Sequence, residues 1–181
     1  KELIENQDFS PDMLKIYPCM VLKGTKLYDM YKKKEYKPLT TEKAANLIAE
    51  FKKSVPSYAR IMRIQRDIPT YATEAGVDKT NLRQYIEKIM KNKKIRCNCI
   101  RCREAGNYLK SKNIKNIKKI LKSIEIKAVH YEASKGAEFF ISAEDFKNKI
   151  LFGFCRLRFP SQLLRKEITE AMRQMINFNT I

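Results

Sequence analysis

The sequence is short of acidic residues and has no long apolar run. Only 20 Asp and Glu stand against 38 Lys and Arg in 181 residues, so the formal net charge is +18. An excess this large costs self-repulsion unless a polyanion neutralises it. No apolar run approaches the roughly 20 residues of a membrane-spanning helix, and no signal peptide is seen. We therefore expect nucleic acid, and no membrane, as the partner.

The sequence also lacks an even set of cysteines that could all pair in disulfides. Five cysteines, mostly clustered, argue against a disulfide framework and favour metal ligation in a reducing compartment, so we expect a cytoplasmic protein. Apolar residues make up 44% of the chain, which is typical of a globular fold. A chain of this length can bury about 70% of its unfolded surface, in one large domain or two small ones. It starts at Lys1 without an initiator Met, and we expect a piece of a longer protein.

Three of the five cysteines gather in one short stretch, I-R-C-N-C-I-R-C-R-E-A-G, residues 95–106. Cys97, Cys99 and Cys102 form a C-x-C-x-x-C cluster. Thiolates this close in sequence can converge on one soft cation through a tight turn, and zinc is the first candidate. Neighbouring guanidinium groups would lower the pKa values of the thiols and favour the metal-binding form. These groups belong to Arg96, Arg101 and Arg103. The alternative is three ordinary small residues on a turn.

The cluster supplies three ligands, whereas a structural zinc site takes four. The remaining soft candidates are Cys19, Cys155 and His130, and spacing does not choose among them, so the fourth ligand comes from tertiary folding or from water. His130 fits a strand residue better than a ligand. An iron–sulfur cluster with one open iron is the competing site. Radical S-adenosylmethionine chemistry usually uses C-x-x-x-C-x-x-C, and that spacing is absent.

The first half of the chain has the pattern of βα units. Residues 12–23 form an apolar run interrupted by Pro18, which predicts a buried strand that runs into a loop. Helices are predicted over 26–36, from the Thr40–Thr41 cap to Pro56, and from a cap near Asn81. The last of these helices ends in lysines, including Lys94, that lead into the cysteine loop.

A strand is predicted over residues 58–69, and its apolar residues are interleaved with Arg60, Arg63 and Arg66. A parallel strand covered on both faces has nearly continuous apolar residues. The charges therefore indicate that one end or one face of this strand points into a polar site. The alternative is an exposed edge strand with solvated arginines.

From Ser123 onward the pattern is that of antiparallel strands. Residues 124–129 alternate, and two strand-like runs, 131–142 and 149–159, are joined by a turn near Asp145–Asn148. A Lys-rich helical segment precedes them, so a domain boundary is expected near 107–123. Residues 161–176 predict a further helix.

Several strings of residues carry a resemblance to a known family. They are G-T-K-L-Y-D-M-Y-K-K-K-E-Y (24–36), R-I-M-R-I-Q-R-D-I-P (60–69), N-L-R-Q (81–84), the cysteine stretch (95–106), Y-E-A-S-K-G-A-E-F-F-I-S (131–142) and G-F-C-R-L-R (153–158). In order and content the chain resembles the catalytic subunit of Elongator, in an archaeal or bacterial form.

The resemblance implies an α/β fold in three parts. Residues 1–94 would be the later half of a radical S-adenosylmethionine type βα barrel, 95–122 a zinc-bearing basic linker, and 123–181 the opening antiparallel strands of a GNAT-like acetyltransferase domain. The implied enzyme is a tRNA acyltransferase that installs a carboxymethyl-type group on the wobble uridine. Its implied cofactors are acetyl-CoA, S-adenosylmethionine and a [4Fe-4S] cluster whose ligands are not in this chain. The glycine-rich pyrophosphate loop of the family is also absent, and residues 170–181 do not match it.

The implied partner is the anticodon region of tRNA, with partner subunits of the Elongator type or a second copy as further possibilities. Single-stranded RNA loops are bound by stacking and hydrogen bonds, and phosphates by Arg and Lys. The candidate tRNA contacts are Arg60, Arg63, Arg66, Arg83, Lys94, Arg101 and Arg103. The alternative for each arginine is an ion pair with a nearby acid such as Asp67 or Glu104. The alternative for the chain is a non-enzymatic, zinc-containing RNA-binding module.

Overall fold

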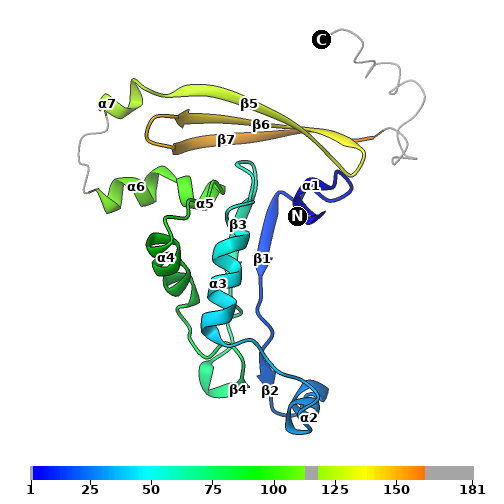
Figure 1. Cartoon of the computed structure of the whole chain (residues 1–181). Helices are drawn as coiled ribbons and strands as arrows, with labels where there is room; N and C mark the ends of the chain where they lie inside the picture. Colours follow the sequence, from blue (N-terminus) through cyan, green and yellow to red (C-terminus); the bar gives the residue numbers. More distant parts are fainter. Residues whose placement is uncertain (1, 113–117, 162–181) are drawn as a thin grey trace. The chain divides into compact units, whose positions relative to one another are not determined.

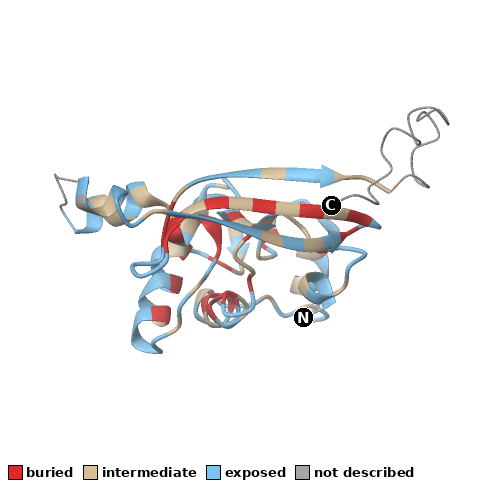
Figure 2. Cartoon of the chain, turned by 90° about the horizontal axis from the view of Figure 1, so that it is seen from above, coloured by how far each residue is buried: buried red, intermediate tan, exposed pale blue. Residues whose placement is uncertain are grey.

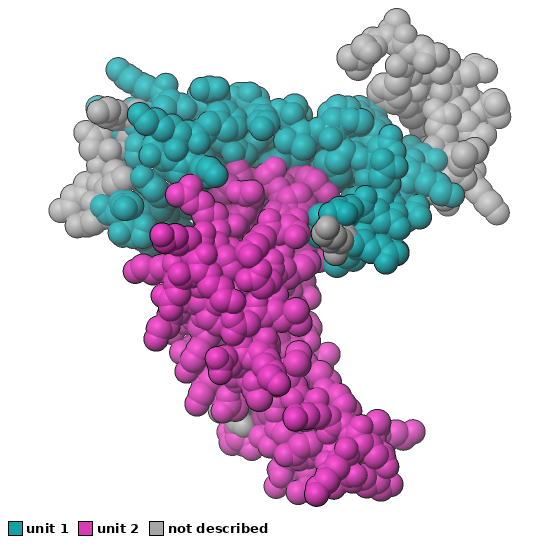
Figure 3. Space-filling view, viewed as in Figure 1, with its two compact units in different colours: residues 1–11, 104–181 teal, residues 12–103 magenta. Residues whose placement is uncertain are grey.

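The computed structural model describes residues 2–112 and 118–161, and the chain forms two compact units (Figures 1 and 3). The first, the strand–helix unit, comprises Asp12–Arg103. The second, the sheet unit, comprises residues 1–11 together with 104–181. The mixed α/β class expected from the sequence is confirmed.

The strand–helix unit contains two small sheets and their helices. β1 pairs with β3 in parallel, and β2 pairs with β4 antiparallel. Its elements are β1 (Met13–Ile16), β2 (Val21–Leu22), α2 (Lys26–Lys32), α3 (Thr41–Phe51), β3 (Arg60–Ile64), the 3-10 turn η1 (Thr70–Ala72), β4 (Thr73–Ala75), α4 (Leu82–Asn92) and α5 (Ile100–Arg103).

The predicted helices begin where their capping residues stand. Thr25 accepts a hydrogen bond from the Tyr28 backbone N–H at the start of α2, and Thr40 accepts one from Lys43 at the start of α3. α4 begins after Asn81 as expected, although the Asn81 side chain donates to Gln84 instead of capping the backbone. Fully buried apolar side chains from α3, β3 and α4 make the core of this unit. They are Ala45, Ala49, Ile61, Leu82 and Ile86.

Two strand predictions differ from the structure. The apolar run 12–23 is two strands in separate sheets, because the chain leaves the β1 pairing at Tyr17 and resumes pairing only at Val21. The strand expected over 58–69 extends only from Arg60 to Ile64, and the loop after it contains η1 and β4. Gln65, directly after β3, has a φ of 100°, which turns the chain out of the strand.

The sheet unit is built on a three-stranded antiparallel sheet in the order β5-β6-β7, as the alternating pattern predicted. Its elements are α1 (Glu2–Glu5), α6 (Ala105–Ser111), α7 (Lys118–Leu121), β5 (Glu125–Ala133), β6 (Gly136–Asp145) and β7 (Ile150–Phe159). Burial alternates along β6, the central strand (Figure 2).

The run 131–142 is not one strand. β5 continues to Ala133, and the chain reverses at Ser134 and Lys135, which have positive φ values of 48° and 61°. Two consecutive residues with positive φ are typical of the tight turn that joins antiparallel strands. Asn-Gly is the usual sequence for this turn, so Ser-Lys gave a weak signal. The turn predicted near Asp145–Asn148 is confirmed, and Asp145 accepts hydrogen bonds from the backbone and side chain of Asn148.

The helix predicted over 161–176 lies outside the described residues. Among the helices that the structure does describe, none has the length and apolar character needed to cross a membrane.

Candidate metal centre and nucleic-acid surface

The cysteine loop begins at the end of α4 and is tied to β3. Lys94 has a φ of 54° and its N–H reaches the Lys91 carbonyl, while the Ile95 N–H reaches Met90, so the helix stops sharply at this point. Buried Ile100 then donates its backbone N–H to Ala59, at 3.0 Å. These bonds bring the cysteine loop back to the start of β3.

Arg103 fastens the other end of the loop. It is only 7% exposed, and its guanidinium donates to the carbonyls of Asn98 at 2.7 Å and Ser57 at 2.8 Å. Hydrogen bonds from a charged donor to buried carbonyls are among the stronger ones in proteins. Arg103 was predicted to contact RNA, but these contacts account for its guanidinium inside the fold.

The three cysteines of the cluster converge as their spacing predicted. The sulfur atoms of Cys97, Cys99 and Cys102 all lie within 4.8 Å of one another. Cys99 is fully buried, Cys97 is partly buried and Cys102 lies at the exposed side. Three sulfurs in this arrangement are a donor set for a soft cation, and they fit zinc.

The sulfurs share their protons unequally. Hydrogen bonds from Cys102 and Cys97 lower the pKa of Cys99. Hydrogen bonds with Cys102 and Cys99 raise the pKa of Cys97. Cys99 is thus the sulfur whose thiolate form its two neighbours favour.

The cation beside the cluster comes from α3, and the sequence did not indicate it. Lys52, the residue after α3, is 2% exposed and its Nζ lies 3.4 Å from the Cys102 sulfur. Burial alone would lower the pKa of Lys52, but Cys102, Cys97 and Cys99 together raise it. The charge that lowers the pKa of Cys99 is that of Lys52, whereas the sequence assigned this effect to the arginines of the loop.

None of the soft residues considered for the fourth ligand joins the cluster. Among the described residues, only the three cysteines form a group of potential Cys, His, Asp or Glu ligands. His130 is a strand residue, as expected, and its ring lies 4.9 Å from that of Phe139 on the neighbouring strand.

Of the predicted tRNA residues of the strand, Arg66 lies beyond the carboxyl edge of the β1–β3 pair. In a parallel pair the carboxyl ends meet at the same edge, and Ile16 lies opposite Ile64 there. Just beyond that edge the guanidinium of Arg66 lies over the ring of Tyr17, 5.4 Å from its centroid. Arg66 is exposed, so this planar pair faces solvent.

Arg63 and Arg60 occupy β3 itself. Exposed Arg63 forms an ion pair with Asp67, so the alternative interpretation holds for this residue in the isolated chain. Arg60 is partly buried, and its backbone N–H donates to Asp12 at 2.8 Å.

Arg83, Arg101 and Lys94 accompany the cysteine loop. Burial and the neighbouring Arg101 lower the pKa of Arg83, while the sulfurs of Cys102 and Cys99 act in the opposite direction. Lys94 is exposed at the end of α4. The structure thus separates the predicted residues: Arg66 lies beyond the carboxyl edge of β1 and β3, Arg60 and Arg63 lie on β3, and the others lie on α4 or in the segment after it.

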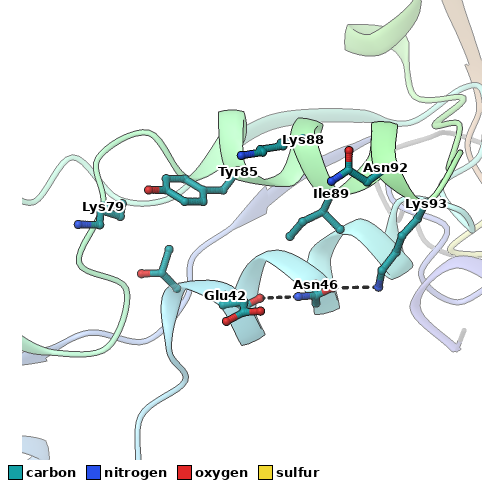
Figure 4. Close-up of a pocket in the computed structure, with 9 residues that line it drawn as sticks. Glu42, Asn46, Lys79, Tyr85, Lys88, Ile89, Asn92 and Lys93 are labelled. Atoms are coloured by element: carbon teal, nitrogen blue, oxygen red, sulfur yellow. Dashed lines mark hydrogen bonds between the residues drawn. The ribbon is translucent and has the colours of Figure 1, made fainter.

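A groove of about 480 Å³ between α3 and α4 was not anticipated (Figure 4). Three lysines line it, Lys79, Lys88 and Lys93, and Tyr85 and Ile89 supply its apolar surface. Lys93 donates to Asn46 at 2.9 Å across the groove. Lys88 lies in α4, Lys93 directly follows it and Lys79 precedes it, and the packing of α3 against α4 places all three around one hollow.

Comparison with known proteins finds a family and several relatives that this chain resembles. Residues 11–92 match the Radical_SAM C-terminal domain family. The chain is 47% identical over 170 residues to the tRNA uridine(34) acetyltransferase of Methanocaldococcus jannaschii, covering 94% of this chain and 31% of that protein. It is 37% identical to Elongator complex protein 3 of Saccharomyces cerevisiae, covering 97% of this chain and 31% of that protein.

A solved structure has the same fold. The archaeal Methanocaldococcus infernus Elp3 with an N-terminal deletion matches with a TM-score of 0.83 and 46% identity, covering 93% of this chain and 39% of that one.

The family match defines the class: residues 11–92 are similar to the C-terminal domain of radical S-adenosylmethionine proteins. More particularly, the chain is homologous over most of its length to part of the tRNA uridine(34) acetyltransferases, the Elongator protein 3 family. It spans about a third of the length of the relatives it matches. The resemblance stated from the sequence motifs is therefore confirmed.

Proposed function

We propose that this chain is part of a tRNA acyltransferase that modifies the wobble uridine with a carboxymethyl-type group. The observation that carries the proposal is the 47% identity, across nearly the whole chain, to a protein named tRNA uridine(34) acetyltransferase. The charge of +18 suits a polyanionic substrate. On this proposal the chain contributes RNA-binding surface and a metal-braced segment to the enzyme.

The RNA surface is proposed first at the carboxyl edge of β1 and β3. Arg66 and Tyr17 together present a guanidinium plane and an aromatic ring to solvent. Unpaired bases stack on such planes, and the guanidinium also attracts phosphate. Ligand sites of parallel α/β folds lie at this edge of the strands, which supports an anticodon contact at Arg66 and Tyr17.

A second part of the proposed RNA surface surrounds the cysteine loop. Arg83 belongs to α4, exposed Lys94 follows that helix, and Arg101 belongs to the cysteine loop. Contacts of such cations with phosphates would orient the RNA on this surface without reading its sequence. Arg103 is left out of this surface because of its burial.

Zinc is proposed as the metal of the cysteine cluster. Bound there, the metal would join the end of α4 to the start of β3 and supply cross-linking rather than chemistry. Cys97, Cys99 and Cys102 would hold it, and Arg103 would keep their loop closed.

The finer assignments of the chain belong to the same proposal. Residues 1–94 are proposed as barrel, 95–122 as zinc-bearing linker and 123–181 as the opening strands of the acetyltransferase domain. Acetyl-CoA, S-adenosylmethionine and a [4Fe-4S] cluster are proposed for the whole enzyme. The match of residues 11–92 to the Radical_SAM C-terminal domain supports the first of these assignments.

The enzyme proposal is tested on the full-length protein that contains this chain. Purified protein should turn over acetyl-CoA faster with tRNA than without it, and should cleave S-adenosylmethionine after cluster reconstitution. If the folded, cluster-loaded protein carries out neither reaction, the enzyme proposal is wrong. The remaining hypothesis is then a non-enzymatic RNA-binding module.

The zinc proposal is tested by metal analysis. We expect one zinc per chain in the wild type and none in the triple variant Cys97→Ser, Cys99→Ser, Cys102→Ser. Cys19→Ser and Cys155→Ser are matched controls, since these residues lie outside the cluster. Equal zinc in the triple variant would remove the site.

A further inference from the structure

The proposed zinc site lacks one ligand, and the side chain of Lys52 reaches one of its three sulfurs. Lys52 follows α3, 50 positions before Cys102, and its Nζ lies 3.4 Å from the Cys102 sulfur. Tetrahedral zinc with the usual Zn–S and Zn–N lengths separates a nitrogen ligand from a sulfur ligand by about 3.6 Å. The observed separation fits one edge of such a tetrahedron.

The spacing of the three sulfurs is compatible with the three other corners of a zinc tetrahedron. All three lie within 4.8 Å of one another, against about 3.8 Å between sulfurs of a tetrahedral zinc site. The Lys52 side chain is buried and in contact with the sulfur of Cys102, which is the position that a fourth ligand would take beside this corner.

Burial supports ligation over an ordinary surface role. Lys52 is 2% exposed, and its side chain donates a hydrogen bond to the Cys102 sulfur. Among the described residues no carboxylate forms an ion pair with it, and its ammonium would have N–H donors without acceptors. A buried ammonium with a single sulfur acceptor is costly, whereas a neutral amine on a metal is satisfied.

The positive charge that three thiolates require is present without Lys52. Arg96 and Arg101 stand directly beside Cys97 and Cys102 in the sequence. Zinc with three thiolates and one neutral amine has a net charge of about −1, which these guanidinium groups can balance.

We propose that Lys52 is the fourth ligand of the cysteine cluster, so that the site is Cys97, Cys99, Cys102 and Lys52. The inference rests on the proposed zinc site. On metal binding the amine gives its proton to solvent, as do the cysteines that are still thiols, and one Zn–N and three Zn–S bonds form with no change of oxidation state.

A direct test uses the wild-type full chain loaded with ¹¹³Cd and labelled with ¹⁵N at lysine Nζ. We expect a one-bond ¹¹³Cd–¹⁵N coupling on a single lysine resonance. A cadmium-loaded protein without that coupling overturns the inference, and this measurement needs no variant to fold.

Substitutions separate a ligand from a counter-charge. Lys52→Met keeps the length of the side chain and its apolar stem, and Lys52→Arg keeps the charge but cannot ligate. We expect both to weaken zinc in a chelator competition by roughly 100-fold or more, and to change the absorption of the Co²⁺ form in the same way. Lys53→Met is the matched control, because Lys53 is exposed and pairs with Glu50, and it should bind zinc as the wild type does.

Each contrary outcome has a separate meaning. Wild-type affinity in Lys52→Arg with loss in Lys52→Met makes Lys52 a counter-charge and overturns ligation. Unchanged affinity in both variants also overturns it, while leaving the three-cysteine site intact. A wild-type chain that binds no zinc removes the proposed site itself.

Discussion

The guanidinium of Arg66 lies 5.4 Å from the centroid of the Tyr17 ring, at the edge where the parallel strands β1 and β3 both end. The two residues follow strands that are far apart in the sequence. Their contact places a cation and an aromatic plane together on an exposed edge, which is what an unpaired base and its phosphate require.

Replacing these two residues tests the proposed RNA surface. Tyr17→Ala should cost about 1–3 kcal/mol of tRNA binding free energy through lost stacking. Arg66→Ala should weaken binding about tenfold and reduce the slope of log K against log salt by about 1. Arg66→Lys should keep the salt slope but not the affinity, because ammonium does not stack as guanidinium does. Filter binding over a salt series measures all three, with Lys37→Ala, an exposed lysine of the same unit, as the control.

The ion pair of Arg63 with Asp67 leads to a substitution that is expected to strengthen tRNA binding, whereas those at Tyr17 and Arg66 are expected to weaken it. Both side chains are exposed, so Asp67→Asn should change the free energy of unfolding by less than about 0.5 kcal/mol. If Arg63 contacts RNA, the same substitution should strengthen tRNA binding about two- to threefold, because a competing carboxylate is removed. Unchanged tRNA affinity in Asp67→Asn would limit Arg63 to its ion pair.

Arg103 is predicted to act on the metal site and not on RNA. Arg103→Met leaves the Asn98 and Ser57 carbonyls without their donor, and should lower the free energy of unfolding by about 2–4 kcal/mol. Zinc affinity should fall with it, because the cysteine loop is no longer closed. At saturating zinc, tRNA binding by the folded variant should equal that of the wild type.

Arg96→Met is the control for Arg103, since Arg96 lies in the same loop but is exposed. Calorimetry and chelator competition on the two variants give the comparison. If zinc-saturated Arg103→Met binds tRNA more weakly than the wild type, Arg103 contributes to RNA binding and this prediction is wrong.

We expect the free energy of unfolding to depend on pH through the carboxyl group of Asp145. Hydrogen bonds from the side chain and backbone of Asn148 hold the pKa of Asp145 below its usual value, with a smaller contribution from Ser123. A carboxyl group whose pKa is lowered by folding stabilises the fold above its unfolded pKa of about 3.9, and loses that effect as the pH falls through the folded value. Asp145→Ala should therefore lower the free energy of unfolding by about 1.5–3 kcal/mol at pH 7, and by progressively less below pH 4. Urea unfolding at several pH values measures the difference, and a difference independent of pH would contradict a role for the carboxylate charge.

Local features of the chain were predictable because they depend on neighbouring residues. The caps at Thr25 and Thr40 mark two helices, and the spacing of Leu82, Ile86 and Met90 marks a third. The antiparallel sheet followed from alternation, apart from the turn at Ser134–Lys135. Its two positive φ values are tolerated by the backbone but carry no sequence signature.

By itself the sequence determined that three thiols converge, since a span of six residues leaves them few other arrangements. It also determined the excess of positive charge, and through its motifs the family. Only the tertiary structure brought Lys52 to the sulfurs, set Arg66 on Tyr17 and turned Arg103 inward to Ser57. Each of these contacts joins residues far apart in the chain, and the packing of helices on strands selects such pairs by shape and burial, which residue spacing does not record.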